Sequence, residues 1–190
     1  MAIRIYVDQG HNPAGNVNAG AVGNDLYEGE ITYNVGAYLA DILDSDGRFL
    51  VRTSRNTPTE VLGTSNATSL AARVREANEW PADYFISIHV NASTNPAANG
   101  SEVYVYQEGT EAANLAAYIL DAIVTLVGTK DNGVRENPSL YVLRRTAMPA
   151  VLVELAYISN TSDAAKLRDN QYEFAYAIYV GLLRYFGFHS

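Results

Sequence analysis

The chain has 190 residues, a formal net charge of −8 and no cysteine. Its length fits one domain, over residues 1–190, with a sizeable core. The lack of cysteine excludes disulfides, thiolate metal sites and cysteine nucleophiles. The acidic balance argues against nucleic acid as the main partner, because phosphate neutralisation needs clustered Lys and Arg. No apolar run approaches the roughly 20 residues of a membrane span.

Strand patterns alternate with helical patterns along the chain. Expected strands cover 3–8, 49–53, 84–88, 102–106 and 150–155, and a further apolar run covers 140–143. Expected helices begin near Glu28, surround Leu70, Val74 and Ala77, and cover 110–127, with Ser162-Asp163 as a candidate cap of another. The stretch 171–186 is apolar on most sides and rich in tyrosine, and it is expected to pack on the sheet. This alternation predicts an α/β fold, with a mainly parallel twisted sheet of about six strands and helices on both faces.

Two of the three histidines directly follow strand patterns. His11 comes after 3–8, and His89 comes after 84–88. Strand ends in an open α/β sheet are where binding sites collect, so two imidazoles there suggest a bound metal. A lone histidine at such a place is more often structural. His189, the penultimate residue, is expected to have no part in a metal site.

Two carboxylates stand at positions where burial is expected. Glu28 lies three residues before Ile31, on the buried stripe at the start of its helix, and Glu154 follows the apolar run 150–153. A buried carboxylate needs a cation, a hydrogen-bond network or a metal. Two His and one Glu, with a position left for water, form a ligand set of hydrolytic zinc, and a second carboxylate can act as general base. Taken singly, Glu28 also fits a helix-dipole role and Glu154 a pair with an arginine.

Several motifs occur in a fixed order along essentially the whole chain. They are Asp8-Gln9-Gly10-His11, the helix-start Glu28, Leu70-Ala71-Ala72-Arg73, Ser87-Ile88-His89-Val90-Asn91-Ala92, Gly100-Ser101-Glu102-Val103-Tyr104, Val142-Leu143-Arg144, and the run from Val151 to Asn160. Any one of them is weak evidence, but the combination is specific. Together they resemble the zinc-dependent N-acetylmuramoyl-L-alanine amidases of the Amidase_3 type.

The resemblance implies a phosphorylase/hydrolase-like fold, one zinc ion held by His11, Glu28 and His89, and Glu154 as the catalytic carboxylate. Such enzymes hydrolyse the amide between the lactyl group of N-acetylmuramic acid and L-alanine in peptidoglycan. The expected partner is therefore peptidoglycan, at the bacterial cell wall, and the expected state is a monomer. Because no signal segment precedes the strand pattern at Ile3, we expect an excised domain or a protein released by another route.

Three further residues are candidates for roles around the metal. Arg135 stands where the family often carries a basic residue, and it is the candidate for contact with the carboxylates of stem peptides; a solvated loop arginine is the alternative. Asn91 is the candidate for shaping the substrate site. Asp8 either accepts a hydrogen bond from a ligand histidine or has a structural role at its strand end.

The chain departs from the family pattern in its loops. Asn12 stands where the family usually has Gly, and Thr53-Ser54-Arg55-Asn56 lacks the acid of the corresponding motif. These departures concern loop geometry and substrate preference, because no ligand is missing. The short segment between 110–127 and Leu140 leaves no room for the plug helix of some family members, which predicts a constitutively open site.

Three other functions stay open at this point. Non-haem iron also uses two His and one carboxylate, although it usually sits in a β-sandwich barrel. A non-catalytic cell-wall binding module would be expected to lack a ligand or Glu154. A zinc peptidase acting on stem peptides shares the ligand types, and the amine end that it releases distinguishes it.

Overall fold

A computed structural model describes residues 2–188 of the chain, and His189 lies outside them. Its centre is a six-stranded sheet in the order β4-β1-β5-β8-β6-β7. The strands are β1 (Ile3–Gln9), β4 (Phe49–Thr53), β5 (Tyr84–Asn91), β6 (Ser101–Val105), β7 (Asp131–Glu136) and β8 (Ala150–Tyr157). Strands β4, β1, β5 and β8 are parallel, whereas β6 is antiparallel to β8 and parallel to β7. The expected mainly parallel sheet is therefore confirmed.

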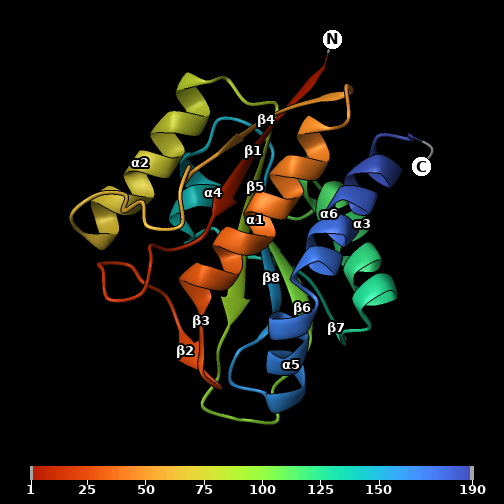
Figure 1. Ribbon diagram of the computed structural model, residues 1–190. Coiled ribbons are helices and arrows are strands. Elements are labelled where there is room, and N and C mark those ends of the chain that lie inside the picture. Colours follow the sequence, from red (N-terminus) through yellow and green to blue (C-terminus); the bar gives the residue numbers. More distant parts are fainter. Residues whose placement is uncertain (1, 189–190) are drawn as a thin grey trace.

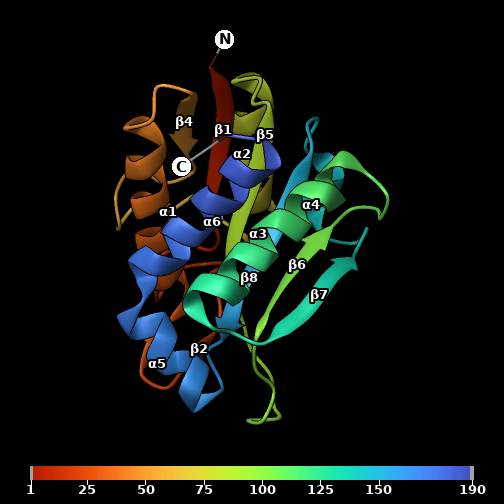
Figure 2. The same ribbon diagram turned by 90° about the vertical axis from the view of Figure 1, so that its right-hand side faces the viewer.

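Helices cover both faces of the sheet, as Figures 1 and 2 show. One face carries α1 (Glu28–Asp44), α3 (Glu111–Val127) and α6 (Gln171–Tyr185); the other carries α2 (Asn66–Glu79) and the short α4 (Tyr141–Arg145). Helix α5 (Thr161–Asp169) connects β8 to α6, and a hairpin of β2 (Val22–Gly23) and β3 (Leu26–Tyr27) precedes α1. The stretch 171–186 forms α6, which contacts α3 and α1 and shares the larger core with the strands, so its expected packing on the sheet is confirmed.

Side chains alternate between the two faces of the sheet, and this alternation sorts the polar residues. Val7, Ile88 and Val153 point into the larger core under α1, α3 and α6, whereas Tyr6 and Leu152 belong to the smaller core under α2 and α4. Because alternate residues of a strand face the same side, the residues two positions after Tyr6 and Leu152 also face α2 and α4. Asp8 and Glu154 are such residues, so the polar groups at this end of the sheet share one face.

Three local expectations were wrong. Strand β5 continues to Asn91, so His89 lies within the strand and not after it. The apolar run 140–143 enters helix α4, and the sixth strand is β7, which is polar because it lies at the edge of the sheet. The N-cap of α5 is Asn160, whose side chain accepts hydrogen bonds from the backbone N–H groups of Ser162 and Asp163.

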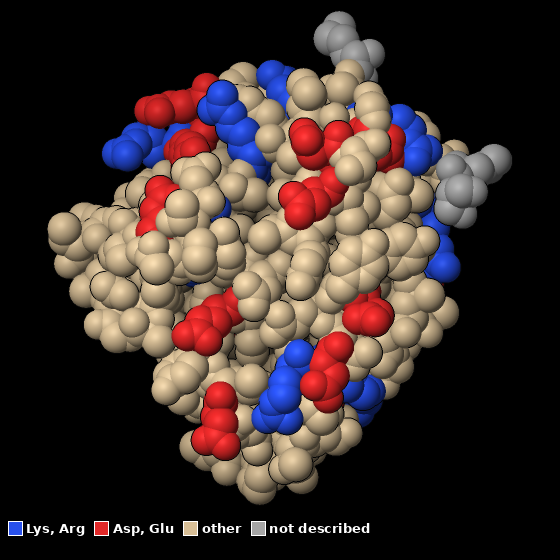
Figure 3. Space-filling model, in the orientation of Figure 1, with Lys and Arg blue, Asp and Glu red and all other residues tan. Residues whose placement is uncertain are grey.

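The charged surface is divided into small groups. On the face drawn in Figure 3, Asp and Glu alternate with smaller clusters of Lys and Arg, with broad uncharged surface between them. This face carries no continuous basic stripe of the kind that tracks a phosphate backbone. Among the described residues, no helix is long and apolar enough to cross a bilayer.

Candidate metal centre and active site

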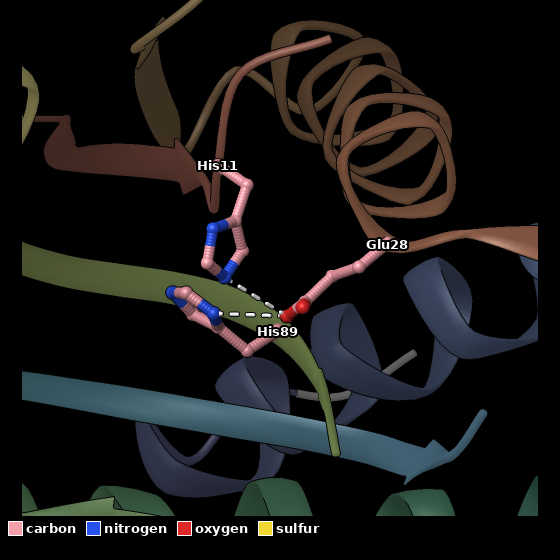
Figure 4. A group of neighbouring side chains, drawn as sticks. All are labelled: His11, Glu28 and His89. Atoms are coloured by element: carbon pink, nitrogen blue, oxygen red, sulfur yellow. Dashed lines mark hydrogen bonds and ion pairs between the residues drawn. The ribbon is translucent and has the colours of Figure 1, made fainter. Parts of the chain in front are cut away.

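His11, Glu28 and His89 meet at one end of the sheet (Figure 4). Oε1 of Glu28 lies 3.2 Å from Nε2 of His11 and 3.2 Å from Nδ1 of His89. One ligand atom from each residue lies within 4.8 Å of the other two. Two donors that bind one zinc ion tetrahedrally at about 2.0–2.1 Å are themselves about 3.4 Å apart. The three residues thus fit a single zinc-sized cation in chemistry and in spacing.

Neighbouring groups fix the orientation of two of these side chains. Nδ1 of His11 lies 3.2 Å from the carbonyl oxygen of Asn18, which can only accept, so this nitrogen carries the proton. Nε2 of His11, which donates to Glu28 while it is protonated, is then the nitrogen that would offer its lone pair to a bound cation. The carboxylate of Glu28 accepts hydrogen bonds from the backbone N–H of Val90, at 2.9 Å, and of Ala21, at 2.7 Å. Both side chains are thereby held in an orientation that a cation at this centre would require.

The electrostatics of the centre favour a cation. Burial by itself would raise the pKa of Glu28, but hydrogen bonds from His11 and His89 and their charge hold that pKa well below its usual range. Burial would likewise lower the pKa of His11, and the contact with Glu28 outweighs it and raises that pKa. The centre is therefore built around an ionised carboxylate that attracts positive charge.

Two buried arginines hold the loop that carries His11. This residue has φ 66°, a left-handed conformation that is uncommon for a residue other than glycine. Its carbonyl oxygen accepts hydrogen bonds from Nη2 of Arg73, at 2.6 Å, and from Nη1 of Arg55, at 3.2 Å. Arg73 also pairs with Asp8 at 2.6 Å, and both side chains are only 1% exposed. The surrounding structure thus maintains the strained backbone that aims the imidazole.

Asp8 and Asn12 act on this loop rather than on a ligand ring. Asp8 accepts hydrogen bonds from Arg73 and from the Ser87 hydroxyl. Of its two expected roles, these contacts support the structural role at the strand end. Asn12 is fully buried; its amide donates to the carbonyl of Leu62, and its oxygen accepts from the Leu62 backbone N–H. The asparagine that stands in place of the usual glycine therefore ties the His11 loop to the segment before α2.

Replacing Arg73 is expected to destabilise the whole domain. Arg73→Met leaves the buried carboxylate of Asp8 without its counter-ion, and breaking a buried pair in this way costs about 3–5 kcal/mol. Urea denaturation measures the change in the free energy of unfolding. Arg75→Met removes an exposed arginine from the same helix and is the matched control. Equal stability of the two variants would contradict the role given to Arg73.

Two glycines leave space for the ligand side chains. A Cβ on Gly10 would lie 2.6 Å from Nε2 of His89, and a Cβ on Gly20 would lie 2.7 Å from Oε2 of Glu28. No real Cβ approaches so closely, so the ring or the carboxylate has to move. Both glycines are thus required by the packing of the metal centre.

Gly10→Ala is accordingly expected to weaken metal binding by about 10–100-fold, the effect of disturbing the groups that orient a ligand. Calorimetric titration with Zn²⁺ measures the dissociation constant. Gly47→Ala, at a turn where an added Cβ meets no atom within 4 Å, is the control. An unchanged dissociation constant in Gly10→Ala would show that His89 is not a ligand.

Glu154 lies beside this centre on the neighbouring strand. It is the direct partner of His89 in the register of β5 and β8, and of Glu102 in the register of β8 and β6. Its Oε2 is buried without a hydrogen-bond partner among the described residues. Burial, and then the charges of Glu28 and Glu102, raise the pKa of Glu154 well above its usual range. A carboxylate perturbed in this way beside a metal centre is typical of a catalytic group.

Arg135 and Asn91 lie in a polar cluster centred on Glu102. Nε of Arg135 is 2.6 Å from Oε2 of Glu102, and Nδ2 of Asn91 donates to Oε1 at 2.6 Å. Arg135 belongs to β7, so the alternative of a loop arginine is wrong. The sequence motifs indicated no site role for Glu102. The available signal was a lone carboxylate in the otherwise apolar strand pattern that it begins.

The sequence model of the family described as N-acetylmuramoyl-L-alanine amidase, Amidase_3, matches residues 5–184. The chain belongs to this amidase family. It is 38% identical over 189 residues to N-acetylmuramoyl-L-alanine amidase LytC of Bacillus subtilis (strain 168), a match that covers 96% of this chain but 35% of LytC. The chain thus spans about a third of the length of that relative.

Solved amidase structures share the fold. The catalytic domain of the amidase CwlV from Bacillus (Paenibacillus) polymyxa var. colistinus is 29% identical, with a TM-score of 0.85 over 98% of this chain and 99% of that one. The amidase AmiC2 of Nostoc punctiforme is 31% identical, with a TM-score of 0.84 over 97% of each chain. The family resemblance based on the sequence motifs is therefore confirmed.

Proposed function

We propose that this amidase-family domain is a zinc-dependent peptidoglycan hydrolase that cleaves the amide between the lactyl group of N-acetylmuramic acid and L-alanine. His11, Glu28 and His89 hold one zinc ion, and Glu154 is the catalytic carboxylate. The site of action is the bacterial cell wall. Both the names of its relatives and the group of His11, Glu28 and His89, which could hold a metal ion, support this proposal.

When bound, zinc polarises the carbonyl that is attacked and lowers the pKa of water. Glu154 takes a proton from the attacking water as the water oxygen bonds to the lactyl carbonyl carbon. It then passes this proton to the alanine nitrogen as the carbon–nitrogen bond breaks. The products are a lactyl carboxylate on the glycan and a stem peptide with a free amino end.

The observation that carries the proposal is the unpartnered, buried Oε2 of Glu154 next to a complete ligand set. A buried carboxylate oxygen without a donor is costly, and natural structures keep such groups where function requires them. In the proposed reaction, Glu154 receives a proton from the attacking water, and this proton takes the place of the missing hydrogen-bond donor. A non-catalytic binding module has no use for this arrangement.

Digestion of purified peptidoglycan by the zinc-loaded domain tests the proposal. Mass spectrometry is expected to find stem peptides whose free amino end is alanine, together with glycan that carries intact lactyl groups. Release of peptides with another amino end would identify a stem-peptide peptidase. No release by a domain that binds zinc and sediments with the wall would identify a binding module.

A further inference from the structure

A row of polar side chains crosses the sheet from the metal centre toward its edge. Register places Glu154 of β8 opposite His89 of β5, and Glu102 of β6 opposite Glu154. Two residues along β6, Tyr104 pairs with Arg135 of β7, on the same face. Neighbouring strands are about 4.8 Å apart, so Glu102 is about one strand beyond Glu154 and Arg135 starts about two strands beyond it.

Glu102 is held from several sides, although it is almost completely buried. Its side chain is 4% exposed. Oε1 accepts hydrogen bonds from Asn91 at 2.6 Å, from the hydroxyl of Tyr104 at 3.1 Å and from the hydroxyl of Tyr157 at 3.4 Å. Oε2 contacts Arg135. Because both oxygens are already engaged, Glu102 is not free to move protons as Glu154 does.

The pair between Glu102 and Arg135 uses only one side of the guanidinium. The contact is made by Nε, at 2.6 Å, and the Arg135 side chain is 52% exposed. Within residues 2–188, no hydrogen bond or ion pair engages either terminal nitrogen of Arg135. An arginine usually binds a carboxylate through two parallel N–H groups, so the fork formed by these nitrogens remains available.

The backbone is irregular where Glu102 lies. The pairing of β6 with β7 shifts register between Ser101 and Val103, and the pairing of β5 with β8 shifts between His89 and Asn91. Irregularities of this kind re-aim side chains and are common next to active sites. Both shifts occur at the same end of the sheet and surround Glu154. At this end of the sheet, Nδ2 of Asn91 donates to Oε1 of Glu102.

We infer that Glu102 is a positioning residue that fixes Arg135 beside the active site, so that its two terminal nitrogens bind a carboxylate of the stem peptide. This inference rests on the proposed function. Glu102 is the register partner of Glu154, and Arg135 contacts Glu102 at 2.6 Å, so the guanidinium lies near the active site. The carboxylate recognised is therefore one that lies close in the stem peptide to the bond that is cut.

Charge explains why such a device is useful here. The chain carries a net charge of −8, and Glu28, Glu102 and Glu154 stand side by side at the centre. An anionic peptide would be repelled by these carboxylates. The positive charge of Arg135 offsets this repulsion locally, and the contact with Glu102 fixes the position of that charge.

The test compares two soluble muramoyl-peptides, one with free stem carboxylates and one in which these are converted to carboxamides. For the parent enzyme, we expect KM to be about tenfold or more lower with the free carboxylates, the effect of a charge-assisted hydrogen-bonded pair. Glu102→Gln and Arg135→Gln are each expected to remove this preference and to leave kcat within about threefold. Their double variant is expected to lose no more than either single variant.

Glu136→Gln is the matched control, because it makes the same charge change as Glu102→Gln at an exposed residue, next to Arg135 in β7 but on the opposite face of the strand. Equal losses on both substrates, or a fall in kcat with KM unchanged, would overturn the inference and give Glu102 a structural or proton-transfer role. Arg135→Gln alters an exposed side chain, so it decides the matter if Glu102→Gln does not fold. Cleavage by the parent without any preference would refute the inference alone, whereas no alanine-ended product would refute the proposed function.

Discussion

Glu154→Gln is expected to lower the rate of stem-peptide release by about 10²–10⁴-fold, the range for loss of a positioned proton-transfer group. Glutamine keeps the size of the side chain and cannot take the proton of the attacking water. Its neutral amide also relieves the repulsion among Glu28, Glu102 and Glu154, so the variant is expected to fold at least as stably as the parent. Quantitative mass spectrometry of the released peptides measures the rate.

Two controls make this result specific to catalysis. Glu108→Gln removes an exposed carboxylate before α3 and is expected to leave the rate unchanged. Zinc content and co-sedimentation with peptidoglycan are expected to be the same in Glu154→Gln as in the parent. Activity within a few fold of the parent would mean that Glu154 is not the catalytic carboxylate, and that another group moves the proton.

Removal of the metal is expected to abolish activity and to lower the midpoint of thermal unfolding by about 5–15 °C. A ligand present at 100–1,000 times its dissociation constant stabilises the native state, and this is the corresponding shift for a domain of this size. The physical cause is that Glu28 and both histidines lose the cation that balances their arrangement. Differential scanning calorimetry, with and without a chelator, gives the shift, and added Zn²⁺ is expected to reverse it.

The same loss is expected without a chelator in Glu28→Gln. Elemental analysis should find well below one zinc per chain, because a neutral amide is a poor ligand. Glu30→Gln changes the next carboxylate in the first turn of α1, where the side chain is exposed, and should retain the metal. A full complement of zinc in Glu28→Gln would remove this residue from the ligand set. Iron in place of zinc in the purified parent would contradict the choice of metal.

The candidate ligand set could be predicted because its residues stand at strand and helix ends in the sequence pattern, and these ends meet in the fold. His11 follows a strand, and Glu28 stands at the N-terminal end of an amphipathic helix with a buried face. The parallel strands β1 and β5 lie side by side, so their carboxyl ends bring His11 and His89 together. The usual topology of α/β sheets was enough to predict that His11 and His89 lie close together, and the family motifs indicated the same residues.

The Glu102 cluster could not be predicted in the same way. Arg135 lies in β7, a polar edge strand without the apolar pattern that marks a buried strand, so the sequence pattern indicated a loop. Asn91 and Glu102 meet only because β6 runs antiparallel to β8, which brings the start of β6 to the end of β5 and β8 where the candidate metal ligands lie. The antiparallel direction of β6 is decided by how the strands pack into the sheet, and local sequence propensity does not predict it.

By itself, the sequence determined the α/β class and predicted the candidate metal ligands and the neighbouring carboxylate Glu154, because these follow from periodicity, from strand ends and from family motifs. Only the tertiary structure decided what surrounds them. Arg73 and Arg55 converge on the carbonyl of His11, and Gly10 leaves room for the ring of His89. These contacts join segments far apart in the chain. Their geometry depends on close packing in three dimensions, which a one-dimensional pattern does not encode.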